Sequence, residues 1–389
     1  MFFDDVFRIR GRLEAACFLI FMAAWLLLLP SCGPDKFASR SQTMSTLERI
    51  KDDNGIYDAY YIDVKYDYDL DKVISECQRN DMSCLEAAYK DSTLDSGFLA
   101  VLLALYGQQN SNGMSFACSA FSKRMAAGDW IMGRNYDWGS SDSSMLLVHC
   151  KPKGGYESIG IACLSHIFDN EPLSGSVQTK AALMAPYCCI DGINEKGVSI
   201  CTLMVNAGNL KQNAGKPVLY LPFLIRMVLD RAATTQQAVE LISQYDVFGA
   251  LQDLTTGTII DYHFYISDAS GDARVVEFDP DDPARATTAT ESDCVTNFYV
   301  MDNNDPAGSD YGYGQDRYQV LKNAFDNAPE ATEDVGWTAL HNAWQDSTIW
   351  SFMANNSTRE FTVEYHKDSQ HRLVFKDFKL VKQDEETEE

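Results

Sequence analysis

The stretch "SFACSAFSKRMAAGDWIMGRNYDW", residues 115–138, carries the strongest structural and chemical signal in this sequence. Its "AAGD" segment, Ala126–Asp129, has the composition of a turn between two strand-like runs, which predicts a β-hairpin. Paired residues lie at equal distances from the turn, so Cys118 is expected opposite the strand segment that contains Arg134 and Asp137. The sequence therefore predicts that both side chains are neighbours of the Cys118 thiol.

The chemistry of this grouping is that of an activated cysteine. A neighbouring arginine favours the thiolate, which is the reactive form, and an aspartate can hold an amine in position. If Cys118 were a chain terminus, its α-amino group, with a reference pKa of about 7.7–8.0, could take the thiol proton without any histidine. Arg134 and Asp137 point to opposite faces of a regular strand, so both reach the thiol only if the strand bends or ends near Asn135.

From Cys118 onward the sequence pattern predicts short strands and helices. Strands are expected at residues 117–125, 130–138, 145–152, 158–166, 181–193, 197–205, 261–270 and 272–280. Helices are expected at 219–245, 316–328 and 338–346, followed by a closing hairpin at 359–381 and an acidic tail at 382–389. Such interleaving favours a layered α+β domain.

The first 32 residues have the features of an export signal. Three arginines precede an apolar run, residues 15–30, which is shorter than the roughly 20 residues of a spanning helix. The run ends in "LPSC", Leu29–Cys32, which resembles a bacterial lipoprotein signal with Cys32 as the lipidated residue. A plain signal peptide or a short uncleaved anchor stays open, and each alternative exports the protein.

Three segments are therefore expected: a signal segment with a lipobox at 1–32, a tether and pro-segment or small subunit at 33–117, and a catalytic domain at 118–389. In the middle segment, residues 33–45 are expected to be a polar tether. A strand is expected at 56–69, and helices at 69–81 and 95–109.

Composition excludes some classes of function. The formal net charge is −24, from 56 acidic and 32 basic residues, which disfavours a nucleic-acid partner. The chain has 11 cysteines, and those outside the signal, the lipidation site and Cys118 are Cys77, Cys84, Cys150, Cys163, Cys188, Cys189, Cys201 and Cys294. Cys77 and Cys84 are close enough in sequence to pair. No zinc-type spacing is found, and the six histidines share no spacing, so we expect them in the core or at the surface.

Cys118 followed by "GRNYDW", with Arg at +16 and Asp at +19, resembles the N-terminal-nucleophile hydrolases. The closest group is the choloylglycine hydrolase family of bile salt hydrolases, penicillin V acylases and linear-amide C–N hydrolases, with acid ceramidase and N-acylethanolamine amidase more distant. Similar motifs follow in the family's order, and the likeness extends to about Phe375. They are "DGINEKGVSI" at 191–200, "HFYISDASGDARVVEF" at 263–278, "CVTNFY" with Asn297, and "QDRYQVLKNA" with Arg317.

The resemblance implies a fold and a mechanism. The fold would be a four-layer αββα sandwich, and the chain would cut itself before Cys118 to free the α-amine. Cys118 would then attack a linear amide of the N-acyl amine, N-acyl amino acid or conjugated bile salt type. Asn297 would stabilise the oxyanion, Arg134 would tune the thiolate, Asp137 would orient the amine, and Arg317 would support the charged site. No metal or organic cofactor is needed.

One position departs from the family's pattern. Where bile salt hydrolases carry an asparagine and penicillin V acylases a tyrosine, this chain has Met204, which cannot donate a hydrogen bond. Asn206 and Asn209 are nearby candidates for the second oxyanion donor. The substitution also argues against assuming bile salts as substrates.

Several alternatives remain at this stage. The same acyl-enzyme could serve an acyltransferase, a surface-binding lipoprotein could have kept the fold without the chemistry, or a thiol protease or transpeptidase could use a histidine. Cys118 could also be a buried structural thiol beside a structural ion pair. The expected partners are a small-molecule amide and a membrane, through a lipid or signal anchor, and homo-oligomerisation is left open. The substrate would depend on loops such as 139–145, 165–178 and 206–216.

Overall fold

The computed structural model describes residues 34–53, 57–78, 117–138, 144–164, 184–205, 210–248, 261–301 and 312–381. Several sequence predictions lie outside these residues: the signal with Cys32, the partner cysteine Cys84, the helix at 95–109, and the oxyanion candidates Asn206 and Asn209. In the part of the chain that is described, no helix is long and apolar enough to cross a bilayer.

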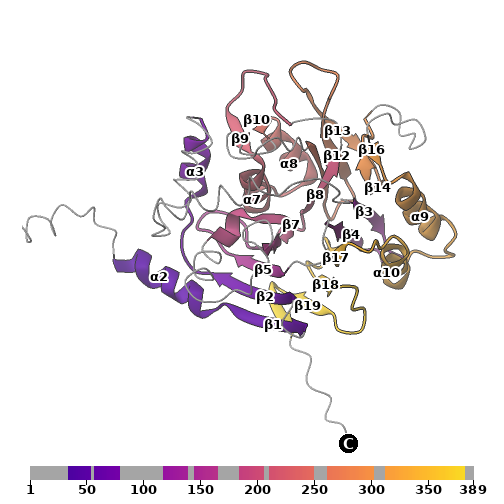
Figure 1. Cartoon of the computed structure of the whole chain (residues 1–389), viewed down its shortest axis with the longest axis horizontal. Coiled ribbons are helices and arrows are strands. Elements are labelled where there is room, and N and C mark those ends of the chain that lie inside the picture. Colours follow the sequence, from indigo (N-terminus) through magenta and orange to yellow (C-terminus); the bar gives the residue numbers. More distant parts are fainter. Residues whose placement is uncertain are drawn as a thin grey trace, which may run out of the picture.

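Two large sheets form the centre of the molecule (Figure 1). The larger has the order β1 (Glu48–Asp53), β2 (Tyr57–Val64), β5 (Met145–Cys150), β6 (Ser158–Cys163), β7 (Cys189–Asn194), β8 (Ser199–Val205), β11 (Asp261–Ser267), β12 (Ala273–Phe278) and β13 (Thr287–Glu291). The smaller has the order β14 (Cys294–Val295), β3 (Ala117–Arg124), β4 (Trp130–Asp137), β17 (Thr348–Asn355), β18 (Phe361–Tyr365), β19 (Leu373–Lys376) and β20 (Lys379–Val381). Two short pairs accompany them: β9 (Val218–Tyr220) with β10 (Asp246–Phe248), and β15 (Asn297–Phe298) with β16 (Gly312–Tyr313).

Helices cover the outer face of each sheet. On the larger sheet, α7 (Leu221–Arg231) contacts β7 and β8, and α8 (Thr235–Ile242) contacts β11 and β12. On the smaller sheet, α9 (Gln315–Asp326) contacts β3 and β14, and α10 (Glu333–Asn342) contacts β4. Figure 1 shows these two helix pairs on opposite sides of the strands. The fold is therefore the expected αββα sandwich.

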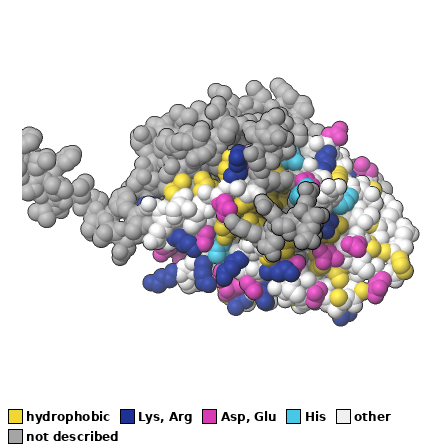
Figure 2. All heavy atoms as spheres, turned by 90° about the horizontal axis from the view of Figure 1, so that it is seen from below, with side chains coloured by type: hydrophobic (Ala, Val, Ile, Leu, Met, Phe, Trp, Pro, Cys, Tyr) yellow, Lys and Arg dark blue, Asp and Glu magenta, His cyan; other side chains and the backbone are white. Residues whose placement is uncertain are grey.

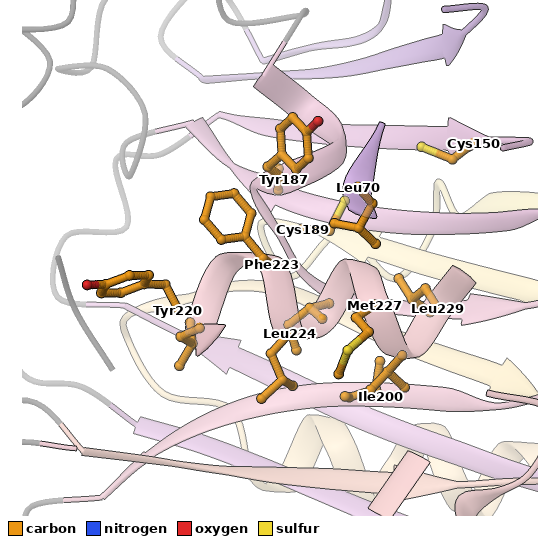
Figure 3. Packing of buried hydrophobic residues seen from close by; sticks show 14 of the residues in the cluster. Leu70, Cys150, Tyr187, Cys189, Ile200, Tyr220, Phe223, Leu224, Met227 and Leu229 are labelled. Carbon is orange, nitrogen blue, oxygen red and sulfur yellow. The ribbon is translucent and has the colours of Figure 1, made fainter. Parts of the chain in front are cut away.

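Strand periodicity explains why the layers stay together. On β5, Leu146 and Val148 belong to the core under α7 and α8, whereas Met145 and Leu147 belong to the core between the two sheets. Successive side chains on a strand face opposite sides, so a strand buried on both faces needs a continuous apolar run. Figure 3 shows the first core, with Phe223, Leu224 and Met227 projecting from α7.

The segment before Cys118 is part of the larger sheet. Strand β2 pairs in parallel with β5, from Ala59 opposite Met145 to Val64 opposite Cys150. The short helix α3 (Leu70–Glu76) contacts α7, and Leu70 joins the core that Figure 3 shows. The described residues of the middle segment thus pack against the part of the chain that follows Cys118 and share its core.

The predicted tether at 33–45 is wrong, because residues Pro34–Ser45 form helix α2. The buried Thr43 hydroxyl donates to the carbonyl of Ser39 and accepts from the backbone N–H of Lys65. The polar composition of this segment gave no sign of the contact, because a single threonine, Thr43, joins the helix to the chain segment after β2.

Other boundaries also differ from expectation. Strand β17, in the middle of the smaller sheet, was not expected, and the helix predicted at 338–346 begins earlier, at Glu333, after the N-cap Thr332. The helical block at 219–245 divides into α7 and α8, because Thr234 caps a new helix by accepting from the backbone N–H of Gln237. Local patterns miss such boundaries when caps and strand partners lie elsewhere in the chain.

The surface is charged with both signs. In Figure 2, Lys and Arg side chains lie among Asp and Glu side chains on the visible face. Among the residues with a described position, Val381 is the one large hydrophobic residue that is exposed.

Candidate active site

The predicted hairpin forms the centre of the candidate site. Strands β3 and β4 are antiparallel, with Cys118 opposite Tyr136 and Ala120 opposite Arg134. Gly128 adopts a φ of 103° in the turn, where glycine is favoured. The placement of Cys118 opposite the segment that holds Arg134 is confirmed.

Arg134 is completely buried and joins three groups. Its Nη1 donates to Asp191 Oδ2, and its Nη2 donates to the Thr202 carbonyl and lies 3.5 Å from Cys118 Sγ. The guanidinium also lies 4.9 Å from the centre of the Tyr136 ring. A planar fork with separate donors suits this arrangement, in which one buried cation faces a carboxylate and a sulfur at once.

Asp137 lies at the end of β4, opposite Ala117. The strand does not end or bend near Asn135 as expected, and the irregularity lies in β17, between Thr348 and Trp350. Asp137 Oδ1 accepts from Thr348 Oγ1 at 2.5 Å. The backbone of Asp137 is therefore paired with the residue that precedes Cys118, and its carboxylate is held by Thr348.

Asn297 and Arg317 come from distant parts of the chain and meet at Cys118. The backbone N–H of Cys118 donates to Asn297 Oδ1 at 2.8 Å. Arg317 donates through Nη2 to the same Oδ1 at 2.8 Å, and through Nη1 to the Cys118 carbonyl. In this uncut chain, the atom that would become the α-amine is thus held by Asn297 rather than by the Asp137 carboxylate.

The approach of Arg317 depends on Gly314, the residue that precedes α9. Gly314 has a φ of 92°, and a Cβ atom there would clash with the Arg317 guanidinium. A side chain at this position would strain the backbone and displace the arginine. The "GYGQDR" sequence thus places Arg317 by leaving room for it.

Burial decides the protonation state of the thiol. The pKa of Cys118 is raised above its ordinary value, because desolvation outweighs the favourable charge of Arg134 and the Asp137 carboxylate opposes ionisation. The pKa of Asp137 is also raised by desolvation, against the lowering effects of Thr348 and Arg317. Arg134 does favour the thiolate as predicted, but the net direction in the uncut chain is toward the neutral thiol.

The sequence motifs concealed the partners of Arg134. Asp191 is the first residue of the "DGIN" motif, and the motif alone assigned it no role of its own. It also accepts from Trp350 Nε1 at 2.9 Å. Thr202 contributes a backbone carbonyl, and a backbone group leaves no residue-type signal. A fully buried arginine needs a carboxylate partner, so a search for an unassigned aspartate within a motif would have found Asp191.

Three uncharged residues are connected to Asn297 by hydrogen bonding or strand pairing. Met204 is half-buried, and its carbonyl accepts from Asn297 Nδ2 at 2.7 Å. Tyr262 pairs with Met204 across β11 and β8, and Tyr313 pairs with Asn297 across β16 and β15. Desolvation by burial raises the pKa of both tyrosines, and charge on Cys118 raises it further.

The histidines described have other partners. His149 and His371 face aspartate or glutamate side chains, His341 faces Glu364, and His263 lies between Glu277 and the Thr296 carbonyl. Within the described ranges, no group of three or more His, Cys, Asp or Glu side chains is placed to hold a metal ion. In the same ranges all eight cysteines are free thiols.

The four layers are those of the N-terminal-nucleophile hydrolase fold, and Cys118 lies near the start of a central strand with its backbone nitrogen held by an asparagine. A family model described as acyl-coenzyme A:6-aminopenicillanic acid acyl-transferase matches residues 124–332, which is more than half of the chain. The protein belongs to this family, whose chemistry is that of amidohydrolases and acyltransferases. The match begins just after Cys118.

Comparison with solved structures gives similar folds at low identity. Penicillin V acylase from Agrobacterium tumefaciens is 15% identical, with a TM-score of 0.49, over 67% of this chain and 87% of that chain. A mutant of conjugated bile acid hydrolase from Clostridium perfringens is 14% identical, with a TM-score of 0.49, over 69% of this chain and 97% of that chain. A comparison with curated proteins found no match.

Proposed function

We propose that the protein is a cysteine N-terminal-nucleophile amidohydrolase that acts on a linear amide and is activated by cleavage before Cys118. The observation that carries the proposal is the meeting of three groups at one residue. Arg134 lies at the sulfur of Cys118, Asn297 accepts from its nitrogen, and Arg317 donates to its carbonyl.

Cleavage supplies the base that the uncut chain lacks. In the uncut chain the nitrogen of Cys118 is an amide and cannot accept a proton. Attack of Sγ on the Ala117 carbonyl carbon would form a thioester, break the C–N bond and pass the thiol proton to the nitrogen. Water would then hydrolyse the thioester, which leaves Cys118 with a free thiol and a free α-amine.

The same groups then act on the substrate. The α-amine takes the thiol proton, and the sulfur attacks the amide carbonyl carbon. As the C–N bond breaks, the ammonium returns the proton to the leaving amine, and an acyl thioester remains on Cys118. Water attacks this thioester with the α-amine as base, so the carboxylic acid leaves and the enzyme is restored.

Asn297 is proposed to serve both the amine and the oxyanion. Its Oδ1 accepts from the Cys118 nitrogen, and one N–H of Nδ2 donates to the Met204 carbonyl. The second N–H can then face the oxyanion, where loss of one such donor typically costs about 2.7–4 kcal/mol in barrier. A backbone N–H near the hairpin or Asn206, which lies outside the described residues, would supply the other donor.

The surroundings of the thiol favour an acyl group without charge. Met204, Tyr262 and Tyr313 are uncharged, both nearby arginines are occupied by protein partners, and the Asp137 carboxylate disfavours a further negative charge. We therefore propose an N-acyl amine or N-acyl amino acid with an apolar or aromatic acyl part. The export signal and lipidation at Cys32 remain proposals from the sequence, and they would place the enzyme at the cell envelope.

An acyl-trapping experiment tests the proposal. The enzyme is mixed with acetyl, phenylacetyl and octanoyl amides of 7-amino-4-methylcoumarin, and intact mass and coumarin release are followed. We expect an acyl group on Cys118 and loss of release in Cys118→Ser, but not in the control Cys188→Ser. Coumarin release by Cys118→Ser at the wild-type rate would refute the assignment.

Acyl transfer is the second candidate, favoured by the name of the matching family model. Hydrolase and transferase share the acyl-enzyme and differ in the group that removes the acyl part. Adding glycinamide to the same assay separates them, because a transferase forms N-acyl glycinamide in preference to the free acid.

A further inference from the structure

The position of Asn297 is not fixed by its own strand. Strand β15 has two residues and pairs only with the two residues of β16. So short a ladder holds a segment weakly. Strand β14 pairs Val295 with Ala120 of β3, and the Asn297 side chain bonds to Cys118, Arg317 and Met204. Further contacts on Thr296 and Val300 help to keep Asn297 Oδ1 beside the Cys118 nitrogen.

One such contact comes from His263 on β11. The side chain is completely buried, its Nε2 lies 2.8 Å from the Thr296 carbonyl oxygen, and its Nδ1 lies 3.1 Å from Glu277 Oε1. A carbonyl oxygen only accepts hydrogen bonds, so Nε2 is the atom that donates to Thr296, while Nδ1 faces the Glu277 carboxylate. The residue before Asn297 is thereby tied to the larger sheet.

The second contact comes from Glu277 on β12. Its carboxylate is completely buried and accepts from the backbone N–H of Val300, at 2.9 Å for Oε1 and 3.2 Å for Oε2. The pair of His263 and Glu277 thus holds the segment on both sides of Asn297. Among the described residues, the hydrogen bonds of this pair go to the segment and to each other rather than to the thiol, so their effect reaches the site through the backbone of this segment.

A buried ionisable pair is costly to desolvate, and an apolar pair of similar size often stabilises a fold as well or better. Here each hydrogen-bonding atom is directed at the segment or at the other member of the pair. We propose that His263 and Glu277 are positioning residues that hold Asn297 against Cys118 and so set the rate of self-cleavage and of amide hydrolysis. This inference rests on the proposed function of Cys118 and Asn297.

A matched pair of substitutions at His263 tests it. The amide nitrogen of glutamine reaches the place of Nε2, whereas that of asparagine reaches only the place of Nδ1. We therefore expect His263→Gln to keep the bond to Thr296 and His263→Asn to lose it. Self-cleavage is measured in cell-free translation as the fraction of chains cut between residues 117 and 118, so no external substrate is needed.

We expect cleavage by His263→Asn to be about 10- to 100-fold slower than by His263→Gln, the range typical of misplaced reacting groups. In the cut enzyme, alkylation of Cys118 by iodoacetamide should also be slower in His263→Asn than in His263→Gln. His341 is the matched control, because it also pairs with a buried glutamate, Glu364, at 2.7 Å. His341→Gln and His341→Asn should differ little from each other in either rate.

Two further variants separate the possible outcomes. Glu277→Gln can still accept from Val300, so a folded Glu277→Gln enzyme that cleaves more than about tenfold slower would show that charge matters rather than position. Equal rates for His263→Asn and His263→Gln, with Asn297→Ala inactive, would overturn this inference alone. Wild-type cleavage by Asn297→Ala would overturn the proposed site itself.

Discussion

At the scale of single residues, the site depends on the three partners that the Arg134 guanidinium contacts at once. Its two terminal nitrogens serve a carboxylate, a carbonyl and a sulfur that come from three strands. A lysine would keep the charge but could occupy only one of these directions. Replacing Arg134 with lysine therefore separates the effect of its charge from the effect of its hydrogen-bond geometry.

Arg134→Lys should lower self-cleavage and amide hydrolysis by about 100-fold, because the sulfur and Asp191 can no longer be held together. The rates are measured by gel analysis of newly made chains and by coumarin release. Arg124→Lys is the control on the same hairpin, since Arg124 is exposed and bonds only weakly, at 3.4 Å, to the Gly128 carbonyl. Equal activity in both variants would show that charge alone suffices at Arg134.

The raised pKa of the buried Cys118 thiol gives a prediction about pH. Below its pKa, the thiolate fraction of the uncut chain rises about tenfold per pH unit, so alkylation should be slow at pH 7 and rise steeply. In the cut chain the α-amine, with a reference pKa of about 7.7–8.0, titrates within this range and flattens the profile. A partly cut sample treated with iodoacetamide contains both forms, and peptide mapping separates them. Identical profiles for the two peptides would contradict the role of the amine.

At the scale of elements, the position of Arg317 depends on the residue that precedes α9. Gly314→Ala should slow self-cleavage by about 10- to 100-fold, because the new Cβ displaces the guanidinium from Cys118 and Asn297. Gly215→Ala is a matched control: Gly215 has a φ of 78° but no atom within 4 Å of the added Cβ. Both variants carry backbone strain. If Gly215→Ala slows self-cleavage as much as Gly314→Ala does, then strain, and not the displacement of Arg317, causes the slower cleavage.

The hairpin could be predicted from the sequence, because its turn fixes the register between Cys118 and Arg134. The contact of Asn297 and Arg317 with Cys118 could be reached only through family resemblance. Both lie far along the chain, and no local pattern gives their distance from the thiol. Strand β17 was missed for a related reason, since its place in the sheet is set by its partners β4 and β18.

At the scale of the whole molecule, the segment before Cys118 is built into the catalytic part. Beyond the pairing of β2 with β5, the Tyr68 hydroxyl lies 2.9 and 2.8 Å from the two carboxylate oxygens of Asp230. Arg226 donates to the same carboxylate at 2.8 Å, and the Tyr187 hydroxyl donates to the Tyr68 carbonyl.

The segment 33–117 should therefore stay bound after cleavage as a small subunit. The two chains should elute together under native conditions and separate in urea. Tyr68→Phe removes a buried hydrogen bond to a charged group, worth about 1.5–3 kcal/mol, so its chains should separate at a lower urea concentration than those of the control Tyr156→Phe. Native mass spectrometry that finds only the large chain would refute retention.

Retention also matters for location. If Cys32 carries a lipid, cleavage before Cys118 removes the covalent link between that lipid and the catalytic part. The pairing of β2 with β5 and the contact of α3 with α7 would then be what keeps the enzyme at the membrane.

The claim on which the account depends most is that Cys118 becomes the first residue of the active enzyme. N-terminal sequencing of purified active protein, with coumarin release measured on the same sample, tests it directly. We predict that the large chain begins at Cys118 and that activity rises in proportion to the cut fraction. An active preparation whose only N-terminus lies at or before Cys32 would contradict the account, because the nitrogen of Cys118 would still be an amide.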